Sequence, residues 1–174
     1  MMSQEIFLKQ RKDEQLGQYS ALEIACYITN YCNKKDYNIT HLRLEKILYF
    51  IQLYYVKEIG SILFWEDIEA WSFGPIISEV YRQFRQYCSF LIDPIEEYWD
   101  LSEGLWKAKK KKYISCINQK DKNNINKVVD MCEKYSTTEL ISISRNQTPW
   151  IKAYRRNMIR KIPISYLQEF CNNI

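Results

Sequence analysis

The chain has 174 residues, of which 47% are hydrophobic and 26% charged, and its formal net charge is +4. This length suits one domain, and the hydrophobic share supplies a core, which excludes a wholly disordered protein. With 4 Gly, 4 Pro and a single His, composition argues against Gly-rich nucleotide loops and excludes a metal site built from several imidazoles. We therefore expect a mainly helical protein that is not an enzyme and holds no cofactor or metal.

The first segment of the chain, residues 1–19, is polar and lacks periodicity. We expect it to form an N-terminal arm, followed by one domain over residues 20–174. No basic stretch followed by an apolar run opens the chain, and no apolar stretch reaches the roughly 20 residues of a membrane span. The six cysteines are scattered without a C-x-x-C pair. Reduced thiols and a cytoplasmic location are therefore expected.

Two helices are predicted in the first third of the domain. Ser20 and Glu23 have the spacing of a capping box, and apolar residues at helical spacing follow them. A second helix is expected from the cap Thr40 through Glu58, ended by Gly60. Its apolar stripe covers much of the circumference, which indicates a central helix packed on more than one side.

A short strand is predicted next. Ile68 and Ala70 alternate with polar or aromatic neighbours, as on a half-buried strand. We expect residues 113–117 to supply the partner strand for the 62–72 segment. The predicted fold class is mainly α: an irregular multi-helix domain with a small two-stranded β element.

A Gly-Pro corner follows this strand. Gly74 is expected to fix a turn, and Pro75 suits the first turn of a helix, where its missing N–H costs nothing. That helix carries apolar residues at helical spacing and is expected to end near Cys88.

The last third of the chain shows helical periodicity again. It resumes at Asn124, and Ser136 with Glu139 predicts a second capping box. Thr148 is expected to cap a further helix with a proline at its first position, and Ser165 to cap a final turn or two.

The charge is unevenly distributed. Residues 61–100 hold two basic and eight acidic residues, a net of −6, whereas residues 101–127 hold eight basic and two acidic residues, a net of +6. An acidic centre followed by a basic segment differs from the uniform basic stripe of a duplex-binding protein. The run Lys109–Lys112 is expected to be a solvated loop, and phosphate contact remains the weaker alternative.

Three segments stand out as motifs: LRLEKILYFIQ at residues 42–52, EAWSFGPIISEVY at residues 69–81, and RNQTPWIKA at residues 145–153. In this order they resemble the Panacea, or SocA-like, antitoxin domain family, and the resemblance covers about residues 20–171. Arg145 stands where the family often has His. Arginine preserves hydrogen-bond donation there, but it provides no group that titrates near neutral pH.

The resemblance implies protein binding rather than catalysis. Panacea-like domains act as antitoxins that neutralise a toxin encoded beside them by direct contact, and one branch delivers its toxin to a AAA+ protease. A cognate toxin, and in that branch a AAA+ protease, are the implied partners, and phages and mobile elements the implied setting. A different function also stays open, a nucleic-acid-binding or anti-defence protein on the same scaffold, which the Lys109–Lys112 run indicates.

Candidate functional residues fall into two sets. Charged residues beside aromatic anchors fit a protein interface, in which a desolvated anchor is surrounded by a polar rim. The predicted partner-binding set is Asp67, Glu69, Trp71, Glu79, Tyr81, Arg82 and Arg85. The motif residues expected to be structural are Phe73, Gly74, Pro75, Pro149 and Trp150. Trp71 is expected to anchor the core as well, and His41 to be an exposed first-turn residue without a catalytic role.

Overall fold

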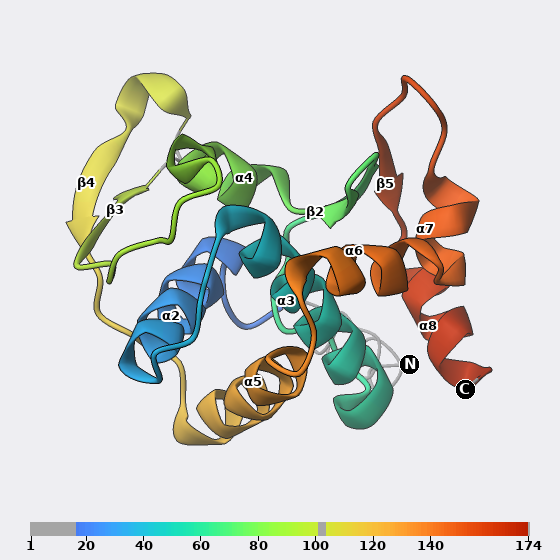
Figure 1. Cartoon of the computed structure of the whole chain (residues 1–174), viewed down its shortest axis with the longest axis horizontal. Helices are drawn as coiled ribbons and strands as arrows, with labels where there is room; N and C mark the ends of the chain where they lie inside the picture. The colour runs from blue at the N-terminus through green and yellow to red at the C-terminus, as the bar shows by residue number, and fades with distance from the viewer. Residues whose placement is uncertain (1–16, 101–103, 174) are drawn as a thin grey trace, which may run out of the picture.

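The computed structural model describes residues 17–100 and 104–173, and in that part of the chain it has seven α-helices and two small antiparallel sheets (Figure 1). The helices are α2 (Ala21–Lys34), α3 (His41–Tyr54), α4 (Ser78–Phe84), α5 (Gln119–Cys132), α6 (Thr137–Arg145), α7 (Thr148–Ala153) and α8 (Ile164–Asn172). The strands are β1 (Ile68–Trp71), β2 (Gly74–Ile76), β3 (Glu97–Asp100), β4 (Lys109–Lys112) and β5 (Arg160–Ile162). The predicted mainly α fold is confirmed.

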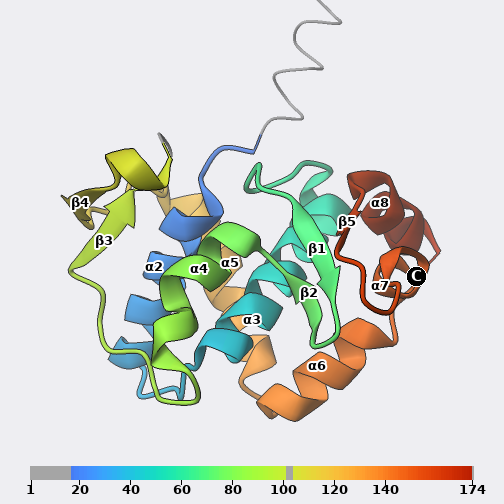
Figure 2. The same cartoon turned by 90° about the horizontal axis from the view of Figure 1, so that it is seen from above.

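Helix α3 is the centre of the domain. It contacts α2, α4, α5, α6 and β2, and Figures 1 and 2 show it enclosed by these elements. Its apolar residues from position 44 to 51 are fully buried, apart from Phe50, and so are three polar ones, Glu45, Lys46 and Gln52. The predicted central helix is therefore confirmed, and its buried polar groups need partners inside the protein.

Helix boundaries depend on local capping groups, several of which were predicted. Thr40 accepts a hydrogen bond from the Arg43 amide, and a π-helical turn (Tyr55–Ile59) extends α3 to Gly60, whose φ is +76°. The capping box at α6 is present in full.

The other predicted capping box forms only in half. The Ser20 hydroxyl accepts from the Glu23 amide, 3.1 Å away, as expected. The Glu23 carboxylate, however, accepts from the Cys116 amide instead of returning to Ser20. The carboxylate expected to cap the helix start thus binds the loop that contains Cys116, which is distant in sequence.

Three predicted helix starts are wrong. Helix α5 begins at Gln119, five residues before Asn124, because the Asn118 side chain caps it there. The first turn of α5 is polar, so apolar periodicity does not detect it. Helix α7 begins at Thr148 itself, with Gln147 in the cap position, and α8 begins before Ser165, directly after Pro163.

The sheet also differs from the prediction. Strand β1 pairs with β2 on one side and β5 on the other, in the order β2-β1-β5. Residues 113–117 form no strand, so their predicted pairing with the 62–72 segment is wrong. The true partner β5, with the sequence Arg-Lys-Ile, has no alternating pattern that would have revealed it.

The lysine run and the Gly-Pro corner are likewise corrected. Lys109–Lys112 is strand β4, not a loop, and pairs with β3 in a separate hairpin. Pro75 lies in β2, and the following helix α4 starts only at Ser78, continuing as a 3₁₀ turn over Arg85–Tyr87 just before Cys88.

The predicted N-terminal arm falls partly outside the described residues, which begin at Gly17. Its last three residues belong to the fold: the amides of Gln18 and Tyr19 donate to the Leu63 carbonyl, and the Tyr19 hydroxyl donates to Asp121. Among the described residues, no helix is both long and apolar enough to span a membrane.

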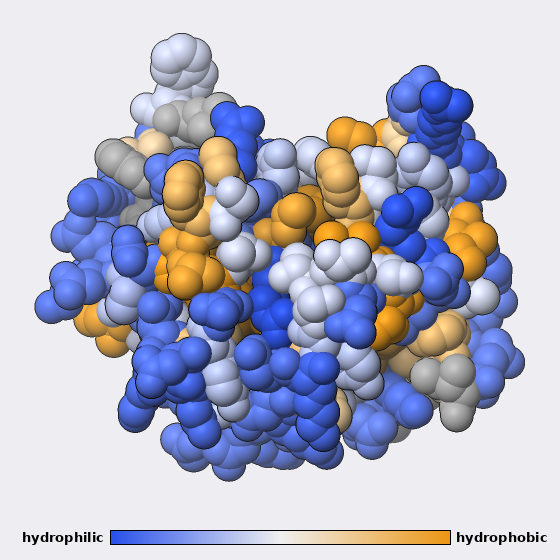
Figure 3. All heavy atoms as spheres, in the orientation of Figure 1, coloured by the Kyte–Doolittle hydropathy of each residue, from blue (hydrophilic) through white to orange (hydrophobic). Residues whose placement is uncertain are grey.

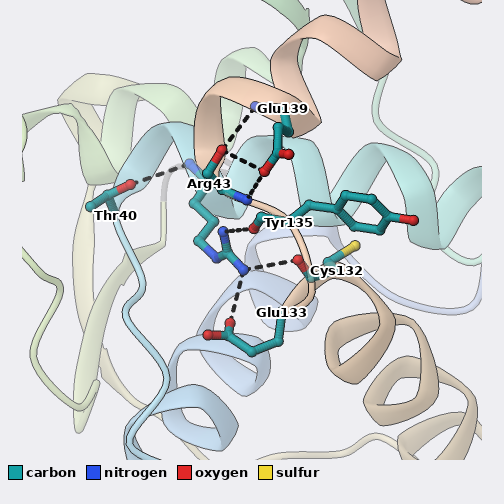
Figure 4. A network of polar contacts seen from close by, with 7 residues as sticks. Thr40, Arg43, Cys132, Glu133, Tyr135 and Glu139 are labelled. Carbon is teal, nitrogen blue, oxygen red and sulfur yellow. Dashed lines mark hydrogen bonds and ion pairs between the residues drawn. The ribbon is translucent and has the colours of Figure 1, made fainter.

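A polar network joins the start of α3 to the turn between α5 and α6 (Figure 4). The Arg43 guanidinium donates to the carbonyl oxygens of Cys132 and Tyr135, at 2.9 and 2.7 Å, and pairs with Glu133 at 2.8 Å. Carbonyls at the end of a helix lack partners within it. Arg43 therefore supplies the donors that the end of α5 lacks.

We expect Arg43→Lys to lower the free energy of unfolding by about 1–2 kcal/mol, because one ammonium cannot serve three acceptors in the geometry of a guanidinium. Urea unfolding measures this change. The matched control is Arg82→Lys at an exposed pair, for which a change below about 0.5 kcal/mol is expected. Equal effects of the two substitutions would show that the network adds nothing.

Candidate functional site

The predicted partner-binding residues lie on the outward face of β1 and on α4. Ile68 and Ala70 of β1 point into the core, so Glu69 and Trp71 point outward and are half-buried. Asp67 precedes the strand and is exposed. Together with Glu79, Tyr81, Arg82 and Arg85 on the segment that follows, these residues define what we call the β1–α4 face.

The Glu69 carboxylate organises the centre of the β1–α4 face. One of its oxygens, Oε2, accepts from the Trp71 indole N–H at 2.8 Å and from the Ser78 hydroxyl at 2.7 Å. This links the strand to the first residue of α4. Glu69 is therefore a residue that orients Trp71, and not only a rim charge.

Aromatic side chains form a row beside this carboxylate. The ring centroids of Trp71 and Tyr81 are 4.9 Å apart, and those of Tyr81 and His41 are 5.7 Å apart. His41 Nδ1 lies 2.6 Å from the Cys88 carbonyl oxygen, which accepts, so the ring hydrogen is on Nδ1. Sequence reasoning missed this role of His41, because nothing local connects it to residues 40 or more positions away.

The rim of the β1–α4 face is less acidic than the sequence indicates. Asp67 pairs with Lys161 of β5, and Glu79 pairs with Arg82 at 3.2 Å. Glu66 accepts from the Ala21 amide at the start of α2, and burial raises its pKa. Several of the carboxylates counted in the acidic centre are thus engaged within the protein.

The motif tryptophan near the C-terminus is a structural anchor. Trp150 is 7% exposed, and its indole N–H donates to the Trp71 carbonyl at 2.9 Å. Its ring stacks on that of Tyr154 and makes a cation–π contact with the Arg145 guanidinium, which lies 5.1 Å from the ring centroid. Pro149 beside it is buried. Of the two tryptophans expected to anchor the core, Trp150 is buried and Trp71 is half-buried.

Two buried side chains of α3 hold the β1–β2 hairpin by hydrogen bonds to its backbone. The Lys46 ammonium donates to the Pro75 carbonyl at 2.5 Å, and Glu45 Oε2 accepts from the Ile77 amide at 2.8 Å. Glu45 Oε1 is buried without a partner. Phe73, at the tip of the hairpin, is 58% exposed and is not part of this anchoring.

Burial dominates the titration of this pair. It raises the pKa of Glu45 above its ordinary value of 4.5 and lowers that of Lys46 below its ordinary value of 10.5. Both charged forms are therefore disfavoured in the folded chain relative to the unfolded one.

We expect Glu45→Gln to change the pH dependence of stability. Because the pKa of Glu45 is raised on folding, the folded chain holds a proton that the unfolded chain releases, and the associated stability is lost as pH rises above 4.5. The glutamine variant should therefore gain stability relative to the natural chain between about pH 5 and about pH 8. Urea unfolding across this range measures the difference, and two parallel curves would contradict it.

The potential metal ligands and thiols of the described residues are dispersed, and three of the thiols are buried. They contain no cluster of three or more His, Cys, Asp or Glu side chains that could hold a metal ion. The cysteines among them are free, and burial raises the pKa of Cys26, Cys32 and Cys132 to about 12. These three thiols therefore stay protonated and unreactive near neutral pH.

The lysine strand β4 is partly matched in charge by its neighbour. In the β3–β4 register Lys112 lies opposite Glu97 and Lys109 opposite Asp100, and Lys110 forms an ion pair with Glu97. This pairing reduces the charge available for phosphates.

Comparison with known protein families gives a match. The family model described as antitoxin SocA-like, Panacea domain, matches residues 44–151, from α3 into α7. No significant match was found among curated proteins or among solved structures. The matched range contains the β1–α4 face and the α3 residues that anchor its hairpin, whereas His41 lies outside it.

Proposed function

Because the chain belongs to the SocA-like Panacea antitoxin family, we propose that it neutralises a cognate toxin by direct protein–protein contact. The family match carries this proposal. We place the contact on the β1–α4 face, because Trp71 and Tyr81 are half-buried aromatic anchors beside a charged rim, the arrangement of an interface hot spot. In this proposal the chain acts in the cytoplasm, and neutralisation needs no catalytic step.

The test begins with the gene beside this one. Expressed alone, its product should stop growth, and co-expression with this chain should restore growth and yield a complex that co-purifies. A neighbouring product that is harmless, or that never binds this chain, would refute the proposal.

A growth assay alone does not separate blocking from proteolytic delivery. If the chain serves as an adaptor, the half-life of the toxin should fall when the chain is present and recover in cells that lack the relevant AAA+ protease. If it blocks, the toxin should persist in the complex.

We expect Arg85→Glu combined with Glu79→Arg to weaken toxin binding by about tenfold or more, because reversed rim charges meet a partner surface selected for the original ones. Both side chains have exposed charged groups, so the fold should be retained. Isothermal titration with the purified toxin measures affinity, and circular dichroism checks helical content. The control is Lys120→Glu, exposed on α5, and an unchanged affinity for the double variant would place the contact elsewhere.

The alternative, nucleic-acid binding through Lys109–Lys112, has less support because β3 partly matches that charge. Retention on nucleic acid that falls steeply with added salt would favour it.

A further inference from the structure

The segment that joins α7 to β5, residues 154–159, projects from the domain with a defined turn, and we call it the α7–β5 loop (Figure 1). The Met158 amide donates to the Arg155 carbonyl at 3.1 Å, and Asn157 between them has a φ of +62°, which Asn adopts more readily than most residues. The Arg155 guanidinium donates to the Tyr154 carbonyl at 2.7 Å. These bonds shape the loop before a partner binds, which lowers the cost of ordering it on binding.

The α7–β5 loop lies at the same end of the three-stranded sheet as the β1–β2 turn. Ala70 of β1 lies opposite Arg160, the first residue of β5. Trp71 lies opposite Gly74 across the β1–β2 turn, and Figures 1 and 2 show the turn and the start of β5 side by side. A hollow of about 210 Å³ is lined by Trp71 together with residues of the loop. Because Trp71 is an anchor of the β1–α4 face, that face and the loop form one continuous surface.

Exposed apolar side chains gather at this end of the sheet. Phe73 of the β1–β2 turn is 58% exposed, and Met158 and Ile159 of the loop are 54 and 62% exposed. Tyr154, which is half-buried, lines the hollow with Met158 and Ile159. A partner bound here would remove this apolar surface from water.

The charge around the α7–β5 loop is positive after the carboxylates beside it are counted. Residues 140–168 contain six basic residues and no acidic one. Among the described residues, three carboxylates form ion pairs with these basic residues or lie opposite one of them in the sheet: Asp67, Glu69 and Glu169. Six positive and three negative charges leave a net of +3. Glu79, on α4, does not change this net because Arg82 pairs with it.

Arg156 carries a positive charge at the tip of the loop. Within residues 17–100 and 104–173 it forms no ion pair, hydrogen bond or ring contact. Figure 3 shows hydrophilic side chains covering the projecting end of the loop. A guanidinium donates through a planar fork that matches a carboxylate. The loop therefore presents free donors for carboxylates next to an apolar surface.

The composition of the loop favours a protein over other anionic partners. The cores of protein interfaces are enriched in Arg, Met and aromatic residues and depleted in Asp and Glu, and the loop sequence YRRNMI follows this pattern. Single-stranded nucleic acid is bound by stacking of bases on aromatic rings, whereas Met158 and Ile159 are aliphatic. Sequence clusters that bind anionic membranes hold about four to eight basic residues, more than the net charge here.

We propose that the toxin contact extends from the β1–α4 face onto the α7–β5 loop, and that the toxin presents there an apolar side chain flanked by carboxylates. The hollow that Trp71 and Met158 line receives the apolar side chain. Arg155 and Arg156 bind the carboxylates. The inference rests on the proposed function and adds to it the chemistry of the partner's surface.

Two variants test the loop, with the purified product of the neighbouring gene as the probe. Arg156→Glu should weaken binding about tenfold, because a carboxylate then faces carboxylates. Met158→Asp should weaken it by about tenfold or more, because an apolar side chain of the toxin would then meet a charge in the hollow. Isothermal titration measures both affinities. Both side chains are exposed, so circular dichroism should show an unchanged fold.

Matched controls make the same chemical changes on α5. Lys120→Glu alters the net charge as Arg156→Glu does, and Met131→Asp places an aspartate at another exposed methionine. Both should bind the toxin normally. Unchanged affinity of the two loop variants would overturn the inference and leave the proposed function standing. A neighbouring product that never binds the natural chain would overturn both.

Two further probes distinguish other anionic partners. A labelled single-stranded oligonucleotide, and phosphatidylcholine vesicles that contain phosphatidylserine, should bind the natural chain no better than they bind Arg156→Glu. A loss of oligonucleotide or vesicle binding in Arg156→Glu, with toxin binding unchanged, would overturn the inference and assign the loop to that partner.

Discussion

Lys46→Met should lower the free energy of unfolding by about 3–5 kcal/mol, the usual cost of removing one partner from a buried polar pair. Lys46, on α3, is fully buried, and its ammonium donates a hydrogen bond to the Pro75 carbonyl. Glu45 lies beside it, also buried, with one carboxylate oxygen that has no partner. Without the ammonium, both acceptors are left inside the protein with less compensation.

The measurement is urea unfolding followed by circular dichroism, with Lys120→Met on the exposed side of α5 as the matched control. We expect the control to change stability by less than about 0.5 kcal/mol. The double variant Glu45→Gln/Lys46→Met should recover part of the loss, because it removes both groups whose charged forms burial disfavours. A single variant no less stable than the control would contradict the role assigned to Lys46.

This substitution also connects stability to the proposed function. Pro75 belongs to the hairpin strand that pairs with β1, and β1 carries Glu69 and Trp71. Loss of the contact between α3 and β2 should therefore loosen the β1–α4 face. In a toxin-neutralisation assay below the melting temperature, Lys46→Met should retain less activity than its folded fraction predicts.

Three of the motif residues that carry the family resemblance are polar anchors in the interior. Lys46 anchors the hairpin, Gln52 binds the Leu63 amide and the Phe64 carbonyl, and the Trp150 indole binds the Trp71 carbonyl. Each joins an element of the helical core to a loop or strand. Motif membership thus reports how the domain is held together, and partner contact must be sought in the exposed residues between the anchors.

What the sequence predicts well is local. The caps Thr40 and Ser136, the αL residue Gly60 and the alternation around Ile68 each act within a few positions, and the structure confirms them. Apolar periodicity also identified α3 as central, because a helix buried on several sides must be apolar around much of its circumference.

What the sequence could not predict depends on distant contacts. The β5 partner of β1 is some 90 positions away and is chosen by where α7 places the chain, not by its own composition. The contact of His41 with Cys88 and the donation from Lys46 to Pro75 span 47 and 29 positions. Contacts between such distant residues leave no periodic pattern in the sequence. From the sequence alone, Lys46 and His41 therefore cannot be distinguished from surface residues.

Gly74→Ala should be the most damaging small change in the hairpin. Gly74 has a φ of +96°, which L side chains rarely adopt, and this strain costs about 1–3 kcal/mol. A Cβ at this position would also lie 2.9 Å from the Ser144 hydroxyl oxygen and 3.1 Å from the Lys46 ammonium. Ser144 is buried on α6, so the added methyl group would push β2 away from α3 and α6. This overpacking should cost about 1–3 kcal/mol more.

Gly104 provides the matched control, because its φ is +94° and a Cβ there would meet no atom of the described residues within 4 Å. Gly104→Ala should therefore show the conformational cost alone, and the difference between the two variants in urea unfolding isolates the crowding at Gly74. Adding Ser144→Ala to Gly74→Ala should recover part of that difference, since it removes the nearest atom. Equal losses for the two single variants would mean that the hairpin can shift away from α3 and α6 without cost.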